Sequence, residues 1–254
     1  MKRLICALLC LALVLAPASA LAEEWKYEGN GFDNPEAAVQ AYIEAFNAGD
    51  VQRMLSTFAI ETVTANTDPV ASAKRQSAFV SGTVSSFPMI DDYTRALAVQ
   101  KRVSEITALL AHQFLRYAMP EAYGIYDGTI IPFKDDADAK IEGLYSAFDQ
   151  SVFKDWFGQI EVVEVITPEG FPSNLSEKYR SESIQSSIEK VKTVCGCEDI
   201  TDCIAHIRIM GEDYLQFMQC CRYDGKWYNY SMYGTAAIVA GLETVTGGLI
   251  PYEL

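Results

Sequence analysis

Apolar residues recur every three or four positions just after Asn34, as on the buried side of an α-helix. Four of them share that side: Val39, Tyr42, Ile43 and Phe46. Asn34-Pro35-Glu36 provides a capping side chain, a proline suited to the first helical position and an acid at the positive end of the helix dipole. The pattern predicts a helix that begins near Pro35 and ends at Gly49.

A second, shorter helix is predicted directly after the first. Asp50 can cap it, and its apolar positions are Val51, Met54, Leu55 and Phe58. The two helices would therefore meet at a sharp corner made by Gly49-Asp50.

The middle of the chain carries two longer helical patterns. The first starts at Asp91 or Asp92 and ends at Pro120, with apolar residues at Val99, Val103, Ile106, Leu110, Phe114 and Tyr117. The second follows Asp136–Asp138 and runs to Trp156, and Ile125–Phe133 between them indicates a loop or a short strand. These elements predict a helical insertion at about residues 70–157.

Strand patterns dominate the last third of the chain. Gln159–Ile166 alternates and is rich in valine and isoleucine, and a helix is expected at Tyr179–Val194. A β-meander follows, with strands at Ile200–Met210, Tyr214–Tyr223 and Lys226–Tyr233. Its two predicted turns are Gly211-Glu212 and Asp224-Gly225.

Two-residue turns determine which residues of neighbouring strands face each other. The pairs predicted in this way are Cys203–Cys220, Cys221–Tyr228 and Gln219–Tyr230. Alternation also puts polar-tipped residues on one face of the meander, among apolar groups, as in the lining of a ligand pocket. These pocket candidates are His206, Arg208, Gln219, Tyr228 and Tyr230.

The run from Asn34 to Ala59 resembles the opening of the nuclear transport factor 2-like superfamily. The matching features are the proline at the helix start, the apolar stripe, the Asn47-Ala48-Gly49-Asp50 corner and the short helix that follows. The resemblance implies an α+β, cone-like fold, in which N-terminal helices pack on a curved antiparallel sheet. It also implies that the first helix crosses the polar-tipped face, where Tyr42 and Phe46 would close the pocket.

The N-terminus has the three parts of a secretory signal peptide. Lys2 and Arg3 precede the apolar run Leu4–Leu15, and small residues around Ala20 and Ala22 suit signal peptidase. The apolar run has about 12 residues, whereas a membrane span needs about 20. We therefore expect residues 1–22 to be removed and residues 23–254 to form a single exported domain, periplasmic or extracellular.

The charge of the chain argues against two classes of partner. It carries 20 Lys and Arg against 34 Asp and Glu, a net charge of −14. Such a field repels phosphate backbones and anionic lipid headgroups, so nucleic acid and membrane surfaces are poor candidates. The sequence shows no glycine-rich phosphate loop and no metal-ligating histidine spacing, so we expect neither a cofactor nor a metal.

Five cysteines remain after the signal peptide: Cys195, Cys197, Cys203, Cys220 and Cys221. Disulfides are their expected fate outside the cytoplasm, with Cys203–Cys220 as the favoured pair. Zinc binding is the alternative, but there is no Cys-x-x-Cys pair. A leftover cysteine could join two chains as a homodimer.

Three functions fit these observations. The first is a non-catalytic exported domain that binds a small apolar or amphipathic ligand or a protein partner. The second is an enzyme like the SnoaL-type cyclases and ketosteroid isomerases, with His206, Arg208 and Tyr230 as acid and base groups. The third is a cell-surface interaction protein that uses the helical insertion.

Export makes a direct prediction about the mature N-terminus. Protein recovered from its native host should begin at Glu23, or at Leu21 if the earlier site is cleaved. N-terminal sequencing measures this, and recovery of the intact Met1 species in the soluble cytoplasmic fraction would contradict it.

Overall fold

The computed structural model describes residues 26–75, 91–118, 158–242 and 246–252. The predicted signal peptide, the segment Ile125–Phe133 and the predicted helix after Asp136–Asp138 lie outside these residues. Among the described helices, none combines the length and the apolar character that crossing a membrane requires.

The two N-terminal helices form where the caps predict them. α2 spans Pro35–Asn47 and α3 spans Val51–Ser56. Asn34 and Asp50 each accept a hydrogen bond from the backbone amide three residues further on, at 2.8 and 2.9 Å. The predicted stripe of α2 is buried, but Val51 at the start of α3 is exposed.

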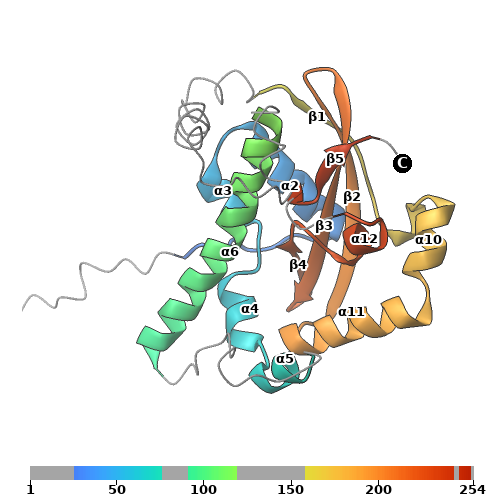
Figure 1. The fold of residues 1–254 in the computed structure, drawn as a ribbon. Helices are drawn as coiled ribbons and strands as arrows, with labels where there is room; N and C mark the ends of the chain where they lie inside the picture. The colour runs from blue at the N-terminus through green and yellow to red at the C-terminus, as the bar shows by residue number, and fades with distance from the viewer. Residues whose placement is uncertain (1–25, 76–90, 119–157, 243–245, 253–254) are drawn as a thin grey trace, which may run out of the picture.

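Three further helices lead towards the sheet. α4 (Glu61–Asn66) and α5 (Pro69–Arg75) are short, and α6 (Asp92–Ala118) starts where the sequence predicts. α6 lies beside α4 and contributes Ile106 and Leu110 to the same hydrophobic core as α2 (Figure 1). Within the predicted insertion, α6 is therefore packed on the core, whereas α5 has no buried residue.

Five strands form one antiparallel sheet: β1 (Ile160–Ile166), β2 (Asp199–Ile209), β3 (Glu212–Tyr223), β4 (Lys226–Ser231) and β5 (Leu249–Pro251). The strand order is β1-β2-β3-β4, and β5 pairs with the part of β3 that β4 does not reach. N-terminal helices on an antiparallel sheet with a C-terminal meander confirm the predicted α+β fold class.

The connection from β1 to β2 contains η3 (Pro168–Gly170), α10 (Ser173–Tyr179) and α11 (Glu182–Cys195). α11 corresponds to the helix predicted at Tyr179–Val194, and α10 is a further helix that ends where the prediction begins. The two helices are separate because Ser181, the N-cap of α11, has extended backbone angles of φ −60° and ψ 146°. A last short helix, α12 (Thr235–Val239), follows β4.

The first hairpin turns at Met210-Gly211, one residue before the predicted Gly211-Glu212. Both turn residues have positive φ, 52° and 90°, as a type I′ turn requires. The predicted opposition of Cys203 and Cys220 is therefore wrong, and Cys203 pairs with Met218. Because the pairing moves by two residues, every side chain of these strands keeps its predicted face.

The second hairpin turns at Asp224-Gly225 as predicted, and Cys221 lies opposite Tyr228. The pairing of Gln219 with Tyr230 is wrong, because a β-bulge shifts the register and places Gln219 opposite Ser231. Beyond the bulge, Met232 joins the apolar face instead of the polar-tipped one.

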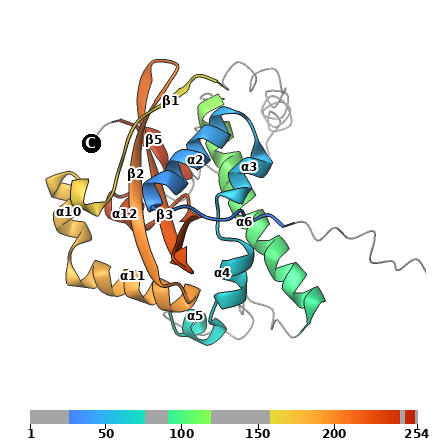
Figure 2. The ribbon, with the colours of Figure 1, turned by 180° about the vertical axis from the view of Figure 1, so that it is seen from behind.

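Helices cover both faces of the sheet (Figures 1 and 2). α2 packs on the apolar face, where Cys203, Ile207 and Met218 are buried, while α10, α11 and α12 pack on the other face. The implied crossing of the polar-tipped face by the first helix is therefore wrong. The apolar stripe of α2 contacts the more apolar face because burial of apolar surface there is the more favourable pairing.

The sheet also divides the cysteines, all five of which are buried free thiols. Cys203 and Cys220 belong to the core beneath α2, and Cys195, Cys197 and Cys221 belong to the other core. Burial and a hydrogen bond with Cys203 raise the pKa of the Cys220 thiol well above its usual value. The two thiols of the first pair are therefore in contact although their backbones are not directly opposed.

Oxidation should join cysteines only within one face of the sheet. We expect non-reducing peptide mapping of oxidised protein to find Cys203 linked to no cysteine other than Cys220, because these two thiols are in contact on the same face of the sheet. A linkage from either residue to one of the other three cysteines would contradict this division. As a control, alkylation of reduced protein should reach the five buried thiols only after unfolding.

Candidate functional site

His206 and Arg208 lie in a charged cluster at one end of the sheet. Both contact Asp213 Oδ1, from His206 Nε2 at 3.0 Å and from Arg208 Nε at 3.1 Å. Arg208 also reaches Glu161 at 3.4 Å, and the His206 ring packs on Tyr252 with a centroid distance of 4.7 Å. The bond with His206 and the nearby Arg208 charge lower the pKa of Asp213. Both side chains thus have a local partner in Asp213.

The other pocket candidates are spread over separate environments. Gln219 is buried beneath α12, Tyr228 is buried near Gly31, and Tyr230 lies against α6. Tyr42 and Phe46 lie on the opposite face of the sheet. The structure therefore does not bring the predicted pocket residues together.

The space beneath α2 is filled by side chains. Tyr42, Phe58, Met218 and Met232 are each less than 2 % exposed there. The Tyr42 hydroxyl donates a 2.6 Å hydrogen bond to Gln113 Oε1, and burial raises its pKa. This side of the sheet is a packed core with its own polar contacts.

Asp202 is a buried carboxylate that the sequence reasoning missed. It accepts hydrogen bonds from the Tyr179 hydroxyl at 2.9 Å, from Gln219 Nε2 at 3.2 Å and from the amide of Ala236 at 3.1 Å. Burial raises the pKa of Asp202 to about 6, although these hydrogen bonds lower it. Position 234 has to be glycine because a Cβ there would overlap the carboxylate.

These contacts make Asp202 an anchor for three elements. It joins α10 through Tyr179, β3 through Gln219 and the first turn of α12 through Ala236. The alternation of side chains along the strand could have identified Asp202, because it lies two residues before Ile204 and four before His206. All three therefore lie on the polar-tipped face.

A cleft of about 390 Å³ opens between η3, α10, α11 and β2. Tyr179, Ile188 and Ile200 line it, with Arg180 and Glu169 also among its lining residues. Asp202 is not among them, because Tyr179 uses its hydroxyl to bond the carboxylate. This cleft therefore gives a ligand no direct access to the buried acid.

A larger groove of about 480 Å³ lies between the N-terminal segment and α6. Figure 2 shows this segment crossing α6. Apolar groups from Tyr27, Ala96 and Val99 line the groove, and Tyr27 and Val99 continue into the core beneath α2. Its polar lining consists of Lys26, Glu61, Asp92, Arg95 and Gln100.

Hydrogen bonds hold the N-terminal wall of the groove in place. Glu61 accepts hydrogen bonds from the amides of Tyr27 and Glu28 at 2.7 and 3.0 Å. The buried Glu28 carboxylate in turn accepts from the amides of Ile60 and Thr62 at the start of α4. This reciprocal capping gives the wall a defined position. Across the groove, Gln100 Nε2 donates to the Tyr27 hydroxyl at 2.8 Å.

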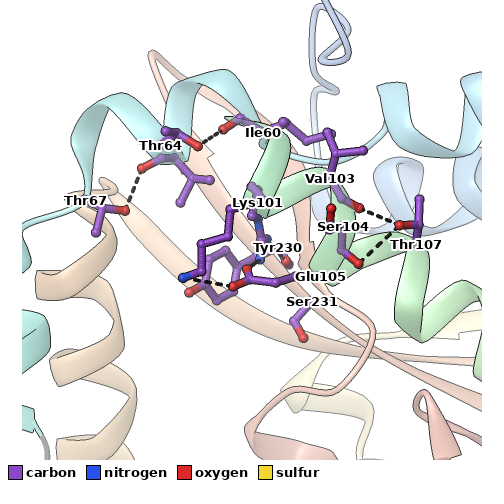
Figure 3. Close-up of polar contacts among 12 residues, drawn as sticks. Ile60, Thr64, Thr67, Lys101, Val103, Ser104, Glu105, Thr107, Tyr230 and Ser231 are labelled. Atoms are coloured by element: carbon purple, nitrogen blue, oxygen red, sulfur yellow. Dashed lines mark hydrogen bonds and ion pairs between the residues drawn. The ribbon is translucent and has the colours of Figure 1, made fainter. Parts of the chain in front are cut away.

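α6, the other wall, is tied to the sheet one turn further on. Arg102 lies over the Tyr230 ring at 4.9 Å and donates to the Tyr230 carbonyl oxygen. Figure 3 shows Tyr230 beside the ion pair between Lys101 and Glu105, which are 3.3 Å apart. Arg102 therefore links α6 to the bulge in β4, and the groove has two anchored walls.

The described residues contain no group of three or more His, Cys, Asp or Glu that could hold a metal ion. Burial raises the pKa of the Cys195, Cys197 and Cys221 thiols, so they are protonated near neutral pH. None of these three cysteines has the low pKa of a nucleophilic thiolate.

No protein-family model and no curated protein matches the chain. Among solved structures, it is similar to a cystatin-like protein from Ruminococcus gnavus ATCC 29149, with 15% sequence identity and a TM-score of 0.45. The match covers 90% of this chain and 43% of the other, so the chain spans less than half the length of that protein. A likeness this distant carries no argument about function.

Asp202 should give the protein an acid-dependent stability. Its pKa is about 6 in the fold, against 3.8 for an unperturbed aspartate, so the folded state binds the proton more tightly. Relative to Asp202→Asn, the wild-type free energy of unfolding should rise by up to about 3 kcal/mol as pH falls from 7 to 4. Urea denaturation of both proteins across this range measures the difference.

Asp213→Asn is the matched control for this experiment. The pKa of Asp213 is lowered by its bond with His206, so its contribution to stability is lost only as pH falls towards and below the usual aspartate value of 3.8. Between pH 7 and 4 the difference in unfolding free energy between wild type and Asp213→Asn should therefore stay nearly constant, whereas the difference for Asp202→Asn should grow. A constant difference between wild type and Asp202→Asn over this range would contradict the assignment.

Proposed function

We propose that the chain is an exported, non-catalytic domain that binds a small amphipathic molecule in the groove between Lys26–Tyr27 and α6. The observation that supports this is the groove itself, whose volume of about 480 Å³ is in the range of small-molecule sites. It combines an apolar lining with a few polar groups, as such sites do.

The finer fold assignment belongs to the same proposal. We assign the chain to the nuclear transport factor 2-like superfamily on the residues from Asn34 to Ala59, and α2 and α3 meet at the corner that this motif describes. The ligand site differs from the one the resemblance implies, because the space beneath α2 is filled.

The other two candidate functions have weaker support. An enzyme would need its buried carboxylate within reach of substrate, but the partners of Asp202 surround it and it does not line the adjoining cleft. An interaction protein working through α6 would expose an apolar stripe. The exposed large apolar residue of the described part of α6 is Tyr93 alone, and polar residues such as Lys101, Ser104 and Glu105 occupy other exposed positions, so no continuous apolar stripe is exposed there.

Filling the groove should abolish binding. Ala96 lines it from an exposed position of α6, so Ala96→Trp adds an indole to the groove without disturbing the core. Fluorescence titration with the neutral apolar probe N-phenyl-1-naphthylamine should show saturable binding to the wild type. We expect the affinity to fall at least about tenfold in Ala96→Trp, since the indole takes the probe's place.

Ala108→Trp provides the control, because Ala108 is also exposed on α6 but does not line the groove. Both variants should keep the wild-type thermal midpoint. If Ala96→Trp binds the probe as well as Ala108→Trp does, the groove is not the binding site.

A further inference from the structure

We infer that the groove selects amphipathic anions: molecules with an apolar body and a carboxylate or similar anionic head, which Lys26 and Arg95 receive from opposite walls. This inference rests on the proposed function and adds the chemical class of the ligand. It follows from which charged groups around the groove already have partners within the protein and which do not.

The two acids of the groove have local roles. Both carboxylate oxygens of Glu61 accept hydrogen bonds from backbone amides, Oε1 from Tyr27 and Oε2 from Glu28. Asp92 is the first residue of α6, where an acid meets the positive end of the helix dipole. The fold therefore already compensates much of the negative charge at the groove.

The two cations have no such partner among the described residues. Lys26 and Arg95 are exposed, and neither forms an ion pair or a side-chain hydrogen bond with the part of the chain that the structure describes. Other cations of this acidic chain do: Arg53 with Glu44, and Lys226 with Asp33. The unpaired positive charges thus flank an apolar groove in a protein whose net charge is −14.

The positions of these cations suit an amphipathic ligand. Lys26 precedes Tyr27 in the N-terminal wall, and Arg95 precedes Ala96 in α6, so each cation adjoins an apolar lining residue. An apolar body would lie against Tyr27, Ala96 and Val99, while its anionic head stays at the solvent-exposed edge beside the cations. A head at that edge keeps part of its hydration, which avoids the cost of burying a charge.

A matched pair of ligands tests this selectivity. Laurate and dodecanol share a twelve-carbon chain and differ in the charge of the head, and both can be titrated as competitors of N-phenyl-1-naphthylamine below their aggregation limits. We expect laurate to displace the probe from wild type at lower concentration than dodecanol does. Raising the salt concentration should weaken the binding of laurate but not that of dodecanol, because salt screens the interaction of the charged head with the two cations.

Two variants identify the groups responsible. Arg95→Gln and Lys26→Gln should each lower laurate affinity by about 1.5- to fivefold, the range for an exposed ion pair, and leave the affinity for dodecanol unchanged. Arg53→Gln is the control, because Arg53 does not line the groove. Thermal midpoints of the three variants should match, since all three positions are exposed.

The possible outcomes distinguish this inference from the proposed function on which it rests. Equal affinity for laurate and dodecanol, both lost in Ala96→Trp, would leave the groove as a binding site and overturn the selectivity. Tighter binding of dodecyltrimethylammonium than of laurate would overturn it as well. If Ala96→Trp does not change the affinity for the probe, the groove is not the binding site, and both the proposed function and the selectivity are wrong.

Discussion

Strands β2 and β3 are buried on both faces, and this constraint governs the rest of the structure. α2 covers one face and α10, α11 and α12 cover the other, so the middle parts of the two strands have no solvated side, whereas the end that carries Arg208 and Asp213 is partly exposed. Each of their polar side chains therefore needs a partner inside the protein, because an unpaired buried polar group is costly. Asp202, Gln216 and Gln219 all have such partners.

Double burial also decides where binding can occur. A sheet with one open face could present a pocket on its concave side, but here helices and large side chains occupy both sides. Two accessible hollows among the described residues lie where peripheral elements meet: beside η3 and α10, and along α6. Of these two, the groove along α6 is the larger, and its walls are anchored by the Glu28–Glu61 capping and by Arg102.

The same burial disfavours ionisation of the side chains in the interior. Cysteine and tyrosine side chains within it have raised pKa values because ionisation would place a charge in a poorly solvated site. Asp202 titrates near pH 6 for the same reason, yet its hydrogen-bond donors surround it and commit it to holding three elements together.

The sequence by itself determined the local elements. The caps at Asn34 and Asp50, the apolar stripe of α2 and the Asp224-Gly225 turn act through neighbours a few residues away, so local patterns sufficed to place them. Alternation likewise placed the side chains of β2 and β3 on the correct faces, because a slip of two residues at Met210-Gly211 leaves parity unchanged.

Only the tertiary structure decided which helices cover which face of the sheet. That arrangement in turn determined where the candidate site lies. The bulge opposite Gln219 is a one-residue event without a clear signal in the sequence; it removed Tyr230 from its pairing with Gln219 and placed Met232 on the apolar face. The groove brings Lys26 and Tyr27 against residues about seventy positions away, and Asp202 meets Tyr179 and Ala236 across 23 and 34 positions. Such contacts depend on how whole elements pack, and no local pattern of apolar and polar residues encodes that.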